Sequence, residues 1–171
     1  MARRIIFIIF AVLLIFAAHS YSQRAYNYYY IHNSFFAEGA TRGAIYSINY
    51  DRVFRFGEEL NYSYRIGGSY YNSRLSGSVG ISAFAGEGAH HPEISALVQP
   101  SAKVSYKEIK PSDIQSNFIG TFGYRYQKLD GPGLFIKAGF GMMFTVDPPF
   151  KSVRDALRPS YVGLVGLGYS F

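Results

Sequence analysis

The sequence contains no cysteine and no tryptophan, and it has no long hydrophobic run after residue 18. Because no disulfide bond can form, a small exported domain of this composition would need another source of stability. A membrane-spanning helix needs about 20 apolar residues, so residues 19–171 hold no candidate for one. The formal net charge is +6, but lysine and arginine are scattered along the chain. We therefore expect no nucleic-acid partner.

Tyrosine, phenylalanine and glycine are abundant instead, with 16, 15 and 18 residues respectively. At 171 residues, the chain has the length of a single domain. Many tyrosines and glycines without long apolar runs are typical of β-barrels in membranes, whose strands alternate between two faces and carry aromatic girdles. The composition therefore favours a membrane β-barrel.

The first residues predict an export signal. Arg3 and Arg4 precede an unbroken apolar run at residues 5–18, which suits a signal peptide and is short for a membrane span. Small residues then stand at the positions expected before a cleavage site. We expect a removable signal peptide at residues 1–22 and a mature domain at residues 23–171, and an uncleaved anchor helix is the alternative.

The rest of the chain alternates with a period of two, which is the pattern of half-buried strands. The segments joining these strands are alternately short and rich in glycine or acids, as at 55–59, 86–90 and 129–132, or longer, as at 107–115 and 145–158. We predict an all-β, closed, eight-stranded, antiparallel up-and-down transmembrane β-barrel, with short turns on the periplasmic side. The predicted strands are residues 27–38, 42–54, 60–71, 75–85, 91–106, 116–128, 133–144 and 159–171.

The distribution of charge indicates which face of these strands is the lumen. A soluble lipocalin-like barrel would place its apolar residues inside, whereas a membrane barrel places them toward lipid. The aromatic-rich face and the export signal together favour lipid outside. Six strand charges fall on the opposite, smaller and more polar face: Asp51, Arg65, Glu93, Lys103, Arg125 and Lys137.

The last ten residues, VGLVGLGYSF, alternate and place Leu167, Tyr169 and Phe171 on one apolar face. This segment resembles the terminal assembly signal of the small outer-membrane β-barrel proteins of Gram-negative bacteria. AIYSINYDRVF, GEGAHHPEISALV and GYRYQKLDGPGLFIKAGF resemble segments of a subset without an assigned activity, and the resemblance covers roughly residues 34–171. It implies an outer-membrane location, contact with outer-membrane lipid and insertion by the barrel-assembly machinery.

Two groups of residues raise the question of catalysis or metal binding. His32 and Ser34, with Glu38 further along the same face, resemble the base, nucleophile and acid of lipid A deacylases. That face is the predicted lumen, whereas such an enzyme needs these groups toward lipid. His90 and His91 near Glu93 lack the spacing of helical zinc sites and are interpreted as a solvated turn. We expect no metal and no cofactor.

The lumen is predicted to be filled by side chains, because eight strands enclose little more than the space that side chains occupy. We expect a charge network of Asp51, Arg65, Glu93, Arg125 and Lys137 in its periplasmic half. Glu93 is predicted to accept a bidentate contact from Arg125. Asp51 is predicted to form ion pairs with Arg65 and Lys137 from across the lumen. The predicted function is therefore a non-enzymatic structural or surface-interaction role, with a ligand that the sequence does not identify. A lipid A-modifying, deacylase-like enzyme is the alternative.

Overall fold

A computed structural model describes residues 33–55, 60–86, 88–104, 114–146 and 159–171. The predicted signal peptide, His32 and most of the two long connections lie outside these ranges. No helix in the described ranges is both long and apolar enough to cross a membrane.

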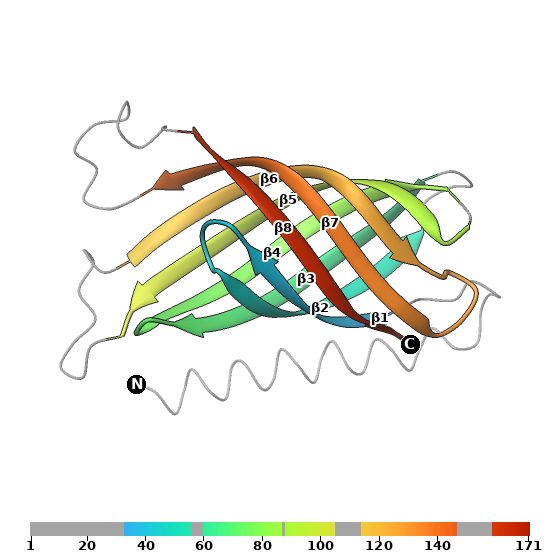
Figure 1. The fold of residues 1–171 in the computed structure, drawn as a ribbon, viewed down its shortest axis with the longest axis horizontal. Coiled ribbons are helices and arrows are strands. Elements are labelled where there is room, and N and C mark those ends of the chain that lie inside the picture. The colour runs from blue at the N-terminus through green and yellow to red at the C-terminus, as the bar shows by residue number, and fades with distance from the viewer. Residues whose placement is uncertain (1–32, 56–59, 87, 105–113, 147–158) are drawn as a thin grey trace. The chain divides into compact units, whose positions relative to one another are not determined.

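Each strand pairs with its neighbours in the chain, and the last strand pairs with the first, so the sheet closes into an antiparallel barrel (Figure 1). The predicted all-β, closed, eight-stranded fold is confirmed. The strands are β1 (Asn33–Ala40), β2 (Tyr46–Arg55), β3 (Leu60–Tyr71), β4 (Arg74–Ala85), β5 (His90–Lys103), β6 (Ile114–Gln127), β7 (Gly133–Val146) and β8 (Pro159–Ser170).

The period-two pattern of the sequence becomes the two faces of the barrel wall. In β5, buried and exposed residues alternate over almost the whole strand. The residues that face inward are mostly small or polar, whereas large apolar side chains face outward, such as Ile81 at 65% exposure and Phe140 at 68%. An outward apolar face of this kind is what a membrane-spanning barrel presents to lipid.

The hairpin of β1 and β2 is shorter than its neighbours, and Figure 1 shows its turn part-way along the barrel. The sequence predicted the second strand to begin at residue 42, but β2 begins at Tyr46. The turn between the two strands contains Gly43, whose φ of 77° lies in the left-handed region that favours glycine. The amide of Ala44 donates to Oε1 of Gln99 on β5 (3.0 Å), so the turn is tied to a side chain from another strand.

Because this hairpin stops early, backbone groups of the flanking strands β3 and β8 would otherwise lack partners. Thr41 exchanges hydrogen bonds with Gly163 of β8: its amide donates to the Gly163 carbonyl, and its Oγ1 accepts from the Gly163 amide, each at 2.9 Å. On the other side, the Tyr46 hydroxyl donates to the carbonyl of Tyr70 on β3. These contacts satisfy backbone groups where lipid could not.

Candidate functional site: the charged lumen

Arg125 of β6 lies inside the lumen and is fully buried. Its Nε donates to Oε2 of Glu93 (2.7 Å), and Nη1 donates to Oδ1 of Asp51 and Oε1 of Gln127 (both 3.0 Å). Its Nη2 donates to Oδ2 of Asp51 and Oγ of Ser63, both at 3.1 Å. A guanidinium has five N–H donors, so every donor of Arg125 has an acceptor.

Two aromatic rings enclose the same guanidinium. The Cζ of Arg125 lies 4.4 Å from the ring centroid of Phe84 on β4 and 5.2 Å from that of Phe135 on β7. Phe135 in turn packs against Phe36 of β1, with ring centroids 4.7 Å apart. Cations over aromatic faces are attracted by the ring quadrupole, most strongly where water is excluded. The rings therefore both stabilise the charge and fill the space around it.

The remaining charges of the lumen are paired as well. Lys137 of β7 donates to Oε1 of Glu93, so Glu93 bridges two cations. Arg65 of β3 donates through Nη1 to Oε2 of Glu38 on β1 at 2.6 Å. These six buried charges, three acidic and three basic, balance one another: Glu38, Asp51, Glu93, Arg65, Arg125 and Lys137.

Hydroxyl and amide groups complete the network. Ser63 Oγ donates to Oδ2 of Asp51 (2.9 Å), and Gln127 Nε2 donates to Oγ of Ser34 (3.1 Å). Ser34 also shares a hydrogen bond with Ser170 of β8 (2.8 Å). Among the described residues, every buried side-chain nitrogen and oxygen has a hydrogen-bond partner. Full satisfaction matters because a buried polar group without a partner is costly.

An apolar layer adjoins the charged one in the lumen. It comprises Leu97, Ile119, Met143 and Val162, with Ala40 packed against it. The space beside Glu93 and Lys137 is too small to hold a water molecule. Charged and apolar side chains thus occupy successive levels of the barrel interior.

The structure brings Glu93 and Arg125 together, but through one bond from Nε. The bidentate contact of Arg125 is with Asp51 instead. The prediction that Asp51 pairs with Arg65 and Lys137 is wrong. Asp51 and Arg65 are directly opposite in the β2–β3 register, yet the long arginine side chain reaches Glu38, and Lys137 reaches Glu93. Lys103 lies at the end of β5 and is exposed.

The interpretation of His90 and His91 as a solvated turn is also wrong. Strand β5 begins at His90, so the next side chain, His91, points into the lumen and is fully buried. Its two ring nitrogens each lie 3.0 Å from a backbone carbonyl oxygen, those of Ala85 and Gln127. His90 faces outward, where its Nδ1 lies 2.5 Å from the Tyr124 hydroxyl. No group of three metal-ligating side chains occurs among the residues that the structure describes.

Two of the three residues that resemble a deacylase site are described. Ser34 is fully buried in the lumen and bonds to Ser170 and Gln127, and Glu38 is the partner of Arg65. Sequence reasoning considered Glu38 only for catalysis and overlooked it as the missing third acid of the charge network. Its place on the polar face of the first strand was the signal that could have shown this.

The predicted assembly signal lies on the outside of the barrel. Leu167, Tyr169 and Phe171 are 59%, 55% and 57% exposed. Phe171 exchanges two backbone hydrogen bonds with Asn33, at 2.7 and 2.9 Å, and so continues the pairing of β8 with β1.

Comparison with solved structures identifies the type of barrel. The N-terminal β-barrel domain of Pseudomonas aeruginosa OprF matches with a TM-score of 0.54 and 11% identity, over 82% of this chain and 96% of that chain. The fold is that of an outer-membrane β-barrel. Neisserial surface protein A (NspA) matches more weakly, with a TM-score of 0.49 and 13% identity, over 83% of this chain and 95% of that chain. The outer membrane enzyme PagL matches with a TM-score of 0.41 and 11% identity, over 82% of this chain and 98% of that chain. The sequence matches no family model and no curated protein.

Proposed function

We propose that this protein resides in the outer membrane of Gram-negative bacteria and has a non-enzymatic structural or surface-interaction role. The observation that carries the proposal is the filled lumen, in which Arg125 uses all its donors between Phe84 and Phe135. A barrel filled in this way serves as a rigid membrane anchor rather than as a diffusion channel. Its ligand would be bound at the surface, by the connections around 107–115 and 145–158.

The outward face supports the proposed location. Each of the eight strands carries at least one large apolar side chain on this face, which suits contact with outer-membrane lipid. Insertion would require the barrel-assembly machinery, which would recognise the terminal strand through Leu167, Tyr169 and Phe171.

Three measurements test the proposal, two in cells and one on the purified protein. Fractionation of a host that expresses the tagged protein should place it with outer-membrane markers. Purified barrel in planar lipid bilayers should give no steady conductance, and a Glu93→Ala, Arg125→Ala double variant should conduct if these side chains close the lumen. Deletion of residues 147–158 should alter envelope integrity while the mass of lipid A stays unchanged. A change in lipid A mass on expression of the wild type would favour the lipid A-modifying alternative and contradict a non-enzymatic role.

A further inference from the structure

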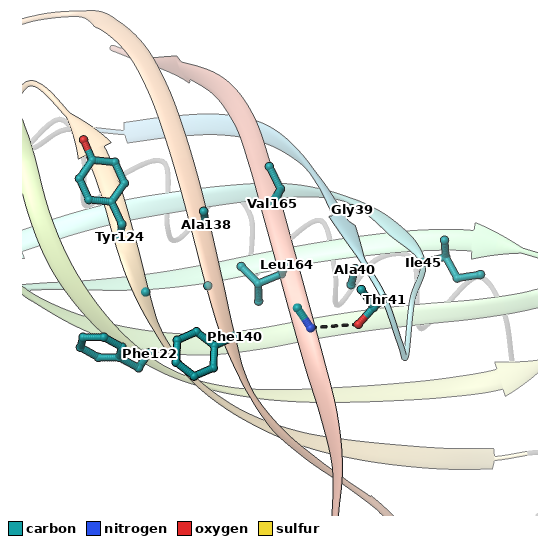
Figure 2. Close-up of a pocket in the computed structure, with 13 residues that line it drawn as sticks. Gly39, Ala40, Thr41, Ile45, Phe122, Tyr124, Ala138, Phe140, Leu164 and Val165 are labelled. Atoms are coloured by element: carbon teal, nitrogen blue, oxygen red, sulfur yellow. Dashed lines mark hydrogen bonds between the residues drawn. The ribbon is translucent and has the colours of Figure 1, made fainter.

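The outer wall of the barrel is not uniformly convex. A groove crosses β6, β7, β8 and the end of β1, and its lining residues are drawn in Figure 2. Its volume is about 840 Å³. Phe122, Phe140 and Tyr124 form one side of it, and Ile45 lies at the opposite end. Its lining is almost entirely apolar, and it lies on the face that this fold presents to lipid.

Small residues create the groove. Gly163 of β8 is paired with Phe140 of β7. In the next row of outward residues, Val165 of β8 is paired with Ala138 of β7 on one side and with Gly39 of β1 on the other. A Cβ atom at Gly39 would approach no atom closer than 3.9 Å, and one at Gly163 none closer than 3.6 Å. Side chains would therefore fit at both positions, and they would occupy the groove.

The exposed backbone amide in the groove already has a hydrogen-bond partner, so a hydrocarbon chain can lie against it. The Gly163 amide faces the place where β1 has ended, and it donates to Oγ1 of Thr41. A backbone amide left without a partner would be costly in contact with a hydrocarbon chain. Thr41 removes that cost.

One end of the groove leads to a polar cluster. Tyr124 lines the groove and also holds His90 through its hydroxyl at 2.5 Å. The His90 ring packs edge-on against Tyr126, with ring centroids 5.2 Å apart. An apolar groove that ends at a hydroxyl and an imidazole offers an acyl chain a lining and a polar headgroup two hydrogen-bonding partners.

We propose that this groove binds one acyl chain of a phospholipid, whose headgroup lies beside His90 and Tyr124. The proposal rests on the outer-membrane location proposed above, because that location supplies the lipid. These groups lie where β5 begins and β6 ends, the end with the short turns. In the proposed orientation this is the periplasmic side, so the lipid belongs to the inner leaflet.

The experiment uses the full-length barrel, refolded in detergent and mixed with dioleoyl phosphatidylethanolamine, with retained lipid counted by native mass spectrometry. The wild type should retain one lipid per barrel. Gly163→Leu should lower the retained fraction roughly tenfold, the effect of losing contact with about two methylene groups. Gly77→Leu is the matched control, because Gly77 faces outward on β4 with open space around it.

A second variant tests the headgroup end. Tyr124→Phe removes the hydroxyl and keeps the ring, so it should weaken retention of phosphatidylethanolamine but not of oleic acid, which has a chain and no phosphate. Equal lipid retention by wild type and Gly163→Leu would overturn the proposal. So would a dimer that Gly163→Leu dissociates, because the groove would then be an interface between two copies. Since the purified barrel is measured, failure here is distinct from failure of fractionation to show an outer-membrane location.

Discussion

Arg125 and Asp51 form a two-bond pair across the lumen, with Nη1 3.0 Å from Oδ1 and Nη2 3.1 Å from Oδ2. They come from β6 and β2, strands that are not neighbours in the barrel. The pair therefore connects opposite walls, which backbone hydrogen bonds between adjacent strands cannot do. Burial of charge limits how much such a pair stabilises the fold, but breaking it leaves an unpaired charge in the interior.

Glu93 gives the sharpest test of the network because it bridges Arg125 and Lys137 and is only 3% exposed. Glu93→Gln keeps the size of the side chain but removes the charge that both cations face. We expect a loss of roughly 3–5 kcal/mol in the free energy of unfolding, measured by urea denaturation in lipid vesicles. Asp130→Asn, in an exposed turn, is the control and should leave the midpoint unchanged. Equal midpoints for the two variants would show that the bridge contributes nothing.

The two adjacent histidines should differ in their effect on stability. His91→Leu removes the ring that lies against the carbonyls of Ala85 and Gln127, and it leaves at least one of them without a donor in the interior. The expected loss is about 1–3 kcal/mol, the cost of an unsatisfied buried acceptor. His90→Leu, on the outer face, should cost clearly less. The same denaturation assay decides, and a larger loss for His90→Leu would contradict the inward placement of His91.

Much of the fold could be predicted from the sequence because a period of two determines both the strand and the side that each residue faces. The alternation predicted that Asp51, Arg65 and Glu93 share one face, and all three are buried in the lumen. The number of strands followed from the same pattern together with the turn residues. These properties depend on residues close together in the chain.

The partners within the lumen could not be predicted in the same way. Asp51 lies opposite Arg65 in the register, but its hydrogen bonds go to Arg125, 74 residues away. Long arginine and lysine side chains can reach several acids in a narrow barrel, so the choice depends on the diameter and stagger of the whole barrel. The late start of β2 was missed because the turn at Gly43 is held by Gln99 of β5, a contact distant in sequence.

Gly141 marks a place where two strands approach too closely for any side chain. A Cβ atom there would lie 1.9 Å from the carbonyl oxygen of Gly120. Gly141→Ala should therefore shift the backbone of β6 or β7 and destabilise the barrel by about 1–3 kcal/mol, as overpacking does. Gly77→Ala, where nothing lies within 4 Å, is the matched control. If both variants melt at the same temperature by circular dichroism, the close approach is not a constraint on stability.

Phe171 is expected to matter more for assembly than for the stability of the finished barrel. Its side chain is 57% exposed on the outer face, and burial of such a group contributes at most about 1.5–3 kcal/mol. Deletion of Phe171 should nevertheless reduce the outer-membrane level of the protein severalfold, because the machinery would no longer recognise the terminal strand. Phe118→Ala is the control, since Phe118 is also an outward aromatic at 46% exposure but lies in β6, away from the terminus. Quantitative immunoblots of membrane fractions measure the levels, and the unfolding midpoint of refolded protein separates assembly from stability. A normal membrane level without Phe171, or an equal reduction by Phe118→Ala, would show that the terminal residue has no special role in assembly.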